Sequence, residues 1–172
     1  MKKPSVTQLL DLLAKPALIS WANTQGLLGI DISKSRRKIL ANGTSLHSQV
    51  ETGAFNNESD AINCNTFMAG KTVLEREKDI ETHWFVGRYD AKIQTDEGVF
   101  IVDYKSGFKG KLYLEHKLQL VAYTMAEPAN MGIVSLPGFQ FMQVVIEDRT
   151  PYEQILVNLS ILWNLKNVVS SL

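Results

Sequence analysis

A short apolar stretch of the sequence carries an aspartate and a lysine two residues apart. The segment Val102-Asp103-Tyr104-Lys105-Ser106-Gly107 is typical of a β-strand that ends at Ser106-Gly107. Side chains alternate along a strand, so Asp103 and Lys105 are expected on one face, about 6.5 Å apart along the chain. A carboxylate and an ammonium among apolar neighbours are costly unless they pair or bind a ligand. The pair therefore predicts either a plain ion pair or a site for chemistry.

A second aspartate, Asp90, is expected beside Asp103. It lies in a predicted strand from Trp84 to Ile93, which the turn Thr95–Gly98 joins to the strand of Asp103. Two adjacent carboxylates repel each other and raise the pKa of one of them, a penalty that a divalent cation removes. Oxygen ligands favour Mg²⁺ or Mn²⁺ over zinc. Such a site fits phosphodiester hydrolysis, with Lys105 orienting the attacking water or stabilising developing charge.

Three further residues have side chains of types that are common in active sites, but each also has an ordinary structural interpretation. Gln119 and Tyr123 are four residues apart on a predicted helix from about Leu114 to Glu127, so they share one face of it. They are either site residues or a half-exposed helical pair. His47 lies on another predicted helix, where a lone histidine is commonly a surface or core residue. The residue types alone do not decide whether these three residues belong to a site or to the surface and core.

Two glutamates and two histidines are interpreted as surface residues. Glu75 and Glu77 are close enough in sequence to approach a metal from a neighbouring strand, but solvated charge is the favoured interpretation for both. His83 and His116 are likewise predicted to lie at the surface.

The elements that position these residues begin with a helical part, residues 1–70. Ser5 or Thr7 is predicted to cap a first short helix, and Pro16 suits the first turn of a second. A third helix is predicted from Ser33 to about Phe55, with Gly43 inside it at a cost of about 1 kcal/mol relative to alanine.

The second part, residues 71–172, is predicted to contain the sheet. The hairpin and the helix from Leu114 are followed by a strand from Phe139 to Ile146 and a terminal helix from Pro151 to about Val169. This order predicts a single α/β domain over residues 1–172, with a mixed central sheet flanked by helices.

The charges are balanced, with 18 basic and 18 acidic residues. Zero net charge disfavours a tight non-specific DNA coat, because phosphate neutralisation supplies much of that affinity. It disfavours an enzyme less, because carboxylates hold the metal while basic residues gather on one face. The candidate phosphate contacts form two clusters, which are otherwise solvated surface: Lys34, Arg36, Arg37 and Lys38, and Lys105, Lys109, Lys111 and Lys117.

Together these motifs resemble the PD-(D/E)XK nuclease superfamily in its RecB-like branch. That branch includes CRISPR-associated adaptation nucleases and the mitochondrial genome maintenance exonuclease. The resemblance covers roughly residues 43 to 126 and rests on Gly43-x-x-x-His47, Gly87-Arg88-Tyr89-Asp90, Val102 to Gly107, and His116-Lys117-Leu118-Gln119-Leu120-Val121-Ala122-Tyr123. An Asp-x-Lys tripeptide alone is a weak signal, but four motifs in the family's order are specific. The resemblance implies a restriction-endonuclease-like core.

The resemblance also implies roles for individual residues. The implied metal ligands are Asp90, Asp103, the Tyr104 backbone carbonyl and, as an additional ligand or a second-metal residue, His47. Lys105 would act at the attacking water. Gln119 and Tyr123 would organise the site and the scissile strand. Products in this family carry a 5′-phosphate, and many relatives are exonucleases that act on single-stranded ends.

The sequence also disfavours iron–sulfur, nucleotide-binding, membrane-spanning and secreted proteins. The single cysteine, Cys64, rules out the four-cysteine iron–sulfur cluster of some family members. Gly70-Lys71-Thr72 looks like the end of a phosphate-binding loop, but Asn65 stands where that loop needs glycine, so no nucleotide cofactor is expected. No apolar run reaches the roughly 20 residues that span a bilayer, and no signal peptide is recognised. A cytoplasmic protein without a membrane partner is therefore expected.

The resulting hypothesis is an Mg²⁺- or Mn²⁺-dependent deoxyribonuclease, expected to be an exonuclease on single-stranded DNA ends. Its setting would be DNA repair, recombination, replication or mobile-element biology, including phages. Alternatives are an endonuclease on the same fold, a catalytically silent nucleic-acid-binding module or accessory subunit, and a scaffold, which only the neutral charge favours. The intact Asp90, Asp103 and Lys105 disfavour a silent copy. Strand polarity, DNA against RNA and oligomeric state stay open.

Overall fold

The computed structural model describes residues 3–13 and 16–170, apart from the side chains at 16–18, 21, 32, 35, 36 and 38–40. The helices in this part of the chain are α1 (Val6–Leu10), α2 (Pro16–Leu27), α3 (Ile32–Thr52), α4 (Glu58–Met68), α5 (Leu114–Ala126) and α6 (Thr150–Val169). The strands are β1 (Thr72–Glu81), β2 (Val86–Thr95), β3 (Gly98–Ser106), β4 (Asn130–Leu136) and β5 (Gln140–Val144).

The five strands form one mixed sheet in the order β1-β2-β3-β4-β5. Neighbouring strands are antiparallel except β3 and β4, which are parallel. Parallel neighbours need a crossover connection, and α5 supplies it. The predicted fold class is therefore confirmed: a mixed sheet flanked by helices, with a helical N-terminal part.

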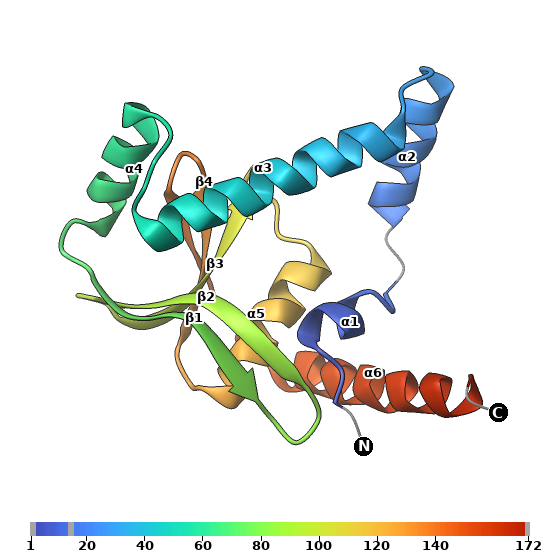
Figure 1. Ribbon diagram of the computed structural model, residues 1–172. Helices are drawn as coiled ribbons and strands as arrows, with labels where there is room; N and C mark the ends of the chain where they lie inside the picture. The colour runs from blue at the N-terminus through green and yellow to red at the C-terminus, as the bar shows by residue number, and fades with distance from the viewer. Residues whose placement is uncertain (1–2, 14–15, 171–172) are drawn as a thin grey trace.

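Helices cover both faces of the sheet (Figure 1). On one face, α1, α5 and α6 pack on a core that includes Tyr89, Ile101 and Ile133. On the other face, α3 and α4 contribute to a second core, which includes Ala91 and Val102. The long helix α3 continues beyond the sheet, and α2 packs at its far end. Successive residues of β3, such as Ile101 and Val102, thus face two different helical layers.

Two of the strands, β1 and β4, were not predicted from the sequence. In β1 the segment Thr72–Glu81 is rich in charged residues, because this strand lies at the sheet edge and most of its side chains are exposed or half-buried. Because β1 has a neighbouring strand on one side only, its sequence shows little of the alternation of apolar and polar residues by which a strand is recognised. In β4, Met131 to Leu136 are all buried and apolar residues are not confined to alternate positions, so the strand shows no period of two in its sequence.

The predicted helix starts are largely confirmed. Ser5 caps α1 through a reciprocal capping box with Gln8, and α2 begins at Pro16. Helix α3 begins one residue before the predicted start, because Asp31 accepts hydrogen bonds from the backbone N–H groups of Ser33 and Lys34. None of the described helices combines the length and apolar character that a membrane crossing requires.

Candidate active site

The Asp103–Lys105 pair lies on the α5-facing side of β3. Asp103 is only 3% exposed, and its Oδ2 atom lies 2.8 Å from Lys105 Nζ. The contact lacks hydrogen-bond geometry, so this buried oxygen accepts no hydrogen bond from the described residues. A buried carboxylate oxygen without a hydrogen bond is costly. Its free lone pairs suit a bound cation or another donor that completes the site.

A chain of polar contacts continues from Lys105 to helix α5. Lys105 Nζ donates a 2.8 Å hydrogen bond to Gln119 Oε1, and Gln119 Nε2 donates a 2.7 Å hydrogen bond to the Tyr123 hydroxyl oxygen. Burial, together with the negative charge of Asp103, raises the pKa of the Tyr123 phenol. The phenol is therefore neutral and keeps its proton as a donor. The structure brings Gln119 and Tyr123 together with Lys105.

Asp90 lies where β2 and β3 stop pairing. The last paired residues are Ala91 and Val102, and the next backbone contact runs instead from the Tyr104 N–H to Asp90 Oδ2, at 2.5 Å. Burial, followed by the charge of Asp103, raises the pKa of Asp90 to about 8. The two aspartates therefore share one electrostatic environment, as adjacent carboxylates are expected to do.

A local irregularity of the β1–β2 hairpin brings Glu77 to the same place. Arg76 pairs with Ala91 and Lys78 pairs with Tyr89, so Glu77 lies directly across from Asp90. Glu77 has a φ of 44°, which is rare for a residue with a side chain and interrupts the alternation of β1. Lys78 consequently reaches Glu75 on the α5 side, whereas Glu77 turns toward α3. Burial and the neighbouring Glu51 raise the pKa of Glu77.

Helix α3 adds His47 because it can approach the end of β3 closely. A Cβ built on Gly43 would lie 3.1 Å from Ser106 Oγ, so glycine allows the helix to come near the strand end. One turn later, the His47 ring packs edge-on against Tyr104, with ring centroids 5.9 Å apart. His47 Nδ1 then lies 3.7 Å from Asp90 Oδ1. Gly43 is thus useful in α3 despite its low helix propensity.

These side chains form a donor set that suits a divalent cation. One ligand atom from each of His47, Glu77 and Asp90 lies within 4.8 Å of the other two. Asp103 does not belong to this group, but its charge is close enough to raise the pKa of Asp90. Carboxylate oxygens with one imidazole are ligands that Mn²⁺ and Mg²⁺ accept. The residues present fit the metal that the sequence resemblance implies.

Glu75 lies on the opposite face of the sheet and takes no part in this cluster. Its carboxylate accepts a short hydrogen bond from the Tyr89 hydroxyl, whose oxygen also lies 3.0 Å from a carboxylate oxygen of Glu127. Lys92 Nζ contacts both carboxylates, at 3.7 Å and 2.9 Å. The hydrogen bond from Tyr89 is the main reason that the pKa of Glu75 falls to about 2. Glu75 is therefore a structural residue between β1, β2 and α5.

Two cavities meet at Ser106. A cavity of about 490 Å³ holds the acidic side, with His47, Glu51, Glu77 and Asp90 on its walls. A second cavity, of about 280 Å³, begins at Lys105 and extends under the loop between β3 and α5. Ser106 lines both. An acidic cleft and a basic cleft therefore adjoin at the end of β3.

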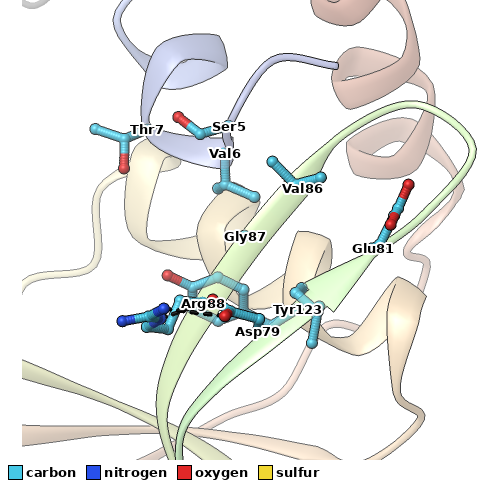
Figure 2. Close-up of a pocket in the computed structure, with 10 residues that line it drawn as sticks. Ser5, Val6, Thr7, Asp79, Glu81, Val86, Gly87, Arg88 and Tyr123 are labelled. Atoms are coloured by element: carbon cyan, nitrogen blue, oxygen red, sulfur yellow. Dashed lines mark hydrogen bonds and ion pairs between the residues drawn. The ribbon is translucent and has the colours of Figure 1, made fainter. Parts of the chain in front are cut away.

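A third cavity, of about 620 Å³, lies between α1 and the β1–β2 hairpin. Figure 2 shows its walls, with Val6 of α1 over the hairpin and an ion pair between Asp79 and Arg88. That arginine makes two hydrogen bonds to the Asp79 carboxylate, at 2.7 Å and 3.0 Å, so its charge is compensated. Tyr123 also lines this cavity and joins it to the polar chain of Lys105. We assign no ligand to it.

The predicted phosphate-contacting residues are distributed unequally around the site. Lys109 and Lys111 line the 280 Å³ cavity. Lys117 is half-buried on the first turn of α5. Lys34 and Arg37 are exposed on the N-terminal half of α3, and Lys34 is 13 residues, or about 20 Å along the helix, from His47. The Arg36 and Lys38 side chains lie outside the described residues.

Of the four residues that the sequence interpretation placed at the surface, Glu77 and His116 lie at the candidate site. Glu77 reaches the cluster because of its unusual backbone angle, which no feature of the sequence around it signals. His116 is half-buried, and its ring contacts Phe108 and Tyr113 edge-on. Its position at the start of the fourth motif was a signal, because that motif begins beside the strand end that carries Lys105.

No family model matches the chain. No curated protein matches it either. Among solved structures, the chain is similar to the crystal structure of a protein described as SSO0001, with a TM-score of 0.45 and 21% sequence identity. The match covers 93% of this chain and 76% of that one. A likeness at this level leaves the function to be derived from the residues.

Proposed function

We propose that this protein is a metal-dependent deoxyribonuclease of the PD-(D/E)XK superfamily, in its RecB-like branch. Its substrate would be single-stranded DNA ends inside the cell, and its products would carry 5′-phosphates. The observation that carries the proposal is the buried Asp103–Lys105 pair next to Asp90. The pair lies on one face of β3, its aspartate has an unsatisfied oxygen, and a second aspartate lies beside it.

The residues that would hold the cation are Asp90 and Asp103, with His47 and Glu77 completing the donor set. When bound, a divalent cation supplies Lewis acidity: it polarises a phosphoryl oxygen and lowers the pKa of a water molecule. The raised pKa of Asp90 marks an environment in which an added positive charge is favourable.

Lys105 would act on the attacking water or on developing charge. Its ammonium is fixed from two sides, by Asp103 and by Gln119. An ammonium has three N–H donors, and one of those of Lys105 is used in the hydrogen bond to Gln119, so donors remain for a phosphoryl or water oxygen. A preorganised donor of this kind typically contributes about 10² to 10³ in rate. Lys105 is held in place before substrate arrives.

Gln119 and Tyr123 would act as positioning residues. Gln119 accepts from Lys105 and donates to Tyr123, so its amide orientation is determined by both neighbours. Tyr123 is buried and belongs to the rigid helix α5. The hydrogen bonds from Tyr123 through Gln119 therefore restrict the position of Lys105. Rotation of Lys105 away from Asp103 would break the hydrogen bond to Gln119 as well.

The direct test uses single-stranded and double-stranded oligonucleotides labelled at the 5′ or the 3′ end. Each is incubated with the protein in Mg²⁺, Mn²⁺ or EDTA, and the products are resolved by length and by terminal phosphate. The proposal predicts metal-dependent shortening of the single strand from an end, with 5′-phosphates on the products. Internal cuts in a circular single strand would instead identify an endonuclease on the same site. Binding without cleavage under any metal would identify a silent nucleic-acid-binding module.

A further inference from the structure

The cavity of about 280 Å³ beside Lys105 combines features that suit one unit of a nucleic-acid strand. It lies at the carboxyl end of β3, under the loop that leads to α5. Clefts outside the carboxyl ends of strands are common binding places in sheets with helical crossovers. The volume is below the roughly 300 Å³ at which pockets for drug-sized molecules begin, so the cavity fits one phosphate with its adjoining sugar or base. A duplex is far too large.

The charge of this cavity favours an anion. Lys105 is compensated by Asp103, but Lys109 and Lys111 form no ion pair with any described residue. Lys111 Nζ lies over the Tyr113 ring, 5.2 Å from its centroid, which places the ammonium at the cavity wall. Two uncompensated ammonium groups in one small cavity repel each other unless an anion lies between them. Phosphate is the anion that a nucleic-acid strand supplies.

His116 adds a neutral hydrogen-bond donor. Its Nδ1 atom accepts a long, 3.5 Å hydrogen bond from the Tyr113 N–H, so the proton of the neutral ring is on Nε2. Burial, followed by the charge of Lys105, lowers the pKa of His116, which keeps the ring neutral at physiological pH. The first turn of α5 lies beside it, and backbone N–H groups at a helix start also favour phosphate.

The rings on the cavity wall provide a surface for a base. Phe108 and Tyr113 contact His116 edge-on, with centroids 5.7 Å and 5.5 Å from the imidazole. Tyr113 is 43% exposed, so part of its ring is open to a ligand. Aromatic rings that accompany basic residues are the usual way to hold single strands.

We propose that this cavity is a subsite for one nucleotide of a single strand, with Lys109, Lys111 and His116 on the phosphate and Tyr113 against the base. The inference rests on the proposed nuclease function and names the route of its substrate. Because Ser106 lines both this cavity and the acidic one, a strand that continues from one to the other passes Lys105. The bound phosphate is either terminal or internal to the strand.

Binding in EDTA tests the subsite separately from cleavage. Fluorescence anisotropy would be measured with internally labelled thymidine decamers that carry a 5′-phosphate, a 3′-phosphate or no terminal phosphate, over a range of salt concentrations. Lys111→Ala should weaken binding several-fold and reduce the salt slope by about 0.7, the value for one phosphate contact on a single strand. Lys111→Arg should retain the slope. Lys166→Ala, which removes an exposed lysine on α6, should bind as the wild type does.

Tyr113→Leu tests the base contact. It should weaken binding of the decamer by about tenfold without changing the salt slope, and should have little effect on an abasic strand. A Lys111→Ala effect on one phosphorylated decamer alone would identify the bound phosphate as that terminal one, and an equal effect on all three decamers would identify it as internal. The subsite is contradicted if folded Lys109→Ala, Lys111→Ala and Tyr113→Leu variants all bind like the wild type. A wild type that binds here but cuts nothing would overturn the nuclease proposal and leave the subsite standing.

Discussion

Asp103 Oδ2 lies 2.8 Å from Lys105 Nζ on the same face of β3, yet this oxygen accepts no hydrogen bond from the described residues. A purely structural ion pair in a buried position would be expected to complete its hydrogen bonds, because its desolvation is otherwise poorly compensated. Here the partner lysine is instead bonded to Gln119. Gln119 thus fixes Lys105, while Asp103 Oδ2 keeps lone pairs that can bind a ligand.

The first prediction concerns metal affinity at Asp103. Asp103→Asn keeps the shape of the side chain but removes its negative charge, so Mn²⁺ affinity should fall by about tenfold or more, equal to ~1.4 kcal/mol. Titration calorimetry with Mn²⁺ measures this change. Asp96→Asn, in the exposed turn between β2 and β3, is the matched control and should leave the affinity unchanged. Equal affinities in the wild type and Asp103→Asn would remove Asp103 from the metal site.

The second prediction concerns pH. The folded protein holds the pKa of Asp90 at about 8, above its ordinary value of 3.8, so the folded state retains a proton that the unfolded state has released. This contribution to stability is fully present below about pH 4 and is lost as pH rises through about 8, at no more than ~1.4 kcal/mol per pH unit. Urea unfolding in EDTA at several pH values measures it.

Asp90→Asn is the comparison for this pH effect. Asparagine keeps an oxygen that can accept from the Tyr104 N–H but does not titrate. The difference between the wild-type and variant free energies of unfolding should therefore change steadily from pH 4 to pH 8. A constant difference across that range would contradict the raised pKa of Asp90.

The third prediction separates two glutamates on β1. Glu77→Gln should weaken Mn²⁺ binding by several-fold, because Glu77 contributes one of three clustered ligand atoms. Glu75→Gln should leave Mn²⁺ binding intact and lower the free energy of unfolding, because it weakens the network of Tyr89 and Lys92. Calorimetry and urea unfolding of both variants check this. The reverse pattern would assign the metal to the other face of the sheet.

The fourth prediction tests how α3 positions His47. Gly43→Ala should leave the free energy of unfolding equal or raise it by up to about 1 kcal/mol, because the exposed Ser106 hydroxyl only has to rotate. The larger side chain of Gly43→Leu cannot be accommodated by rotation of the Ser106 hydroxyl. This variant should move α3 away from β3 and weaken Mn²⁺ binding several-fold. If Gly43→Leu binds Mn²⁺ like the wild type, close approach of the helix does not set the position of His47.

The strand that carries Asp103 and Lys105 was predicted well from the sequence because its signals are local. Asp103, Lys105 and the hairpin are placed by alternation over a few residues, and Gln119 and Tyr123 by the four-residue helical spacing. Glu77 was missed because its place depends on a left-handed backbone angle at the sheet edge. Strand β4 was missed because burial on both faces removes the alternation that identifies a strand. The open aromatic cavity beside His116 depends on loop packing between distant residues, which spacing does not encode.

If the proposal is right, Lys105 acts in catalysis on a site that Asp103 helps to build. The measurement is the single-turnover rate of cleavage of an end-labelled single-stranded oligonucleotide in Mn²⁺, with Mn²⁺ affinity measured on the same preparations. Lys105→Ala should bind Mn²⁺ and DNA but cut at least ~10²-fold more slowly, whereas Asp103→Asn should lose both rate and metal affinity. The double variant should be little slower than either single one, because the two residues act as a unit. Cleavage by Lys105→Ala at the wild-type rate, or a folded wild type that cuts nothing with Mg²⁺ or Mn²⁺, would contradict the catalytic role of this site.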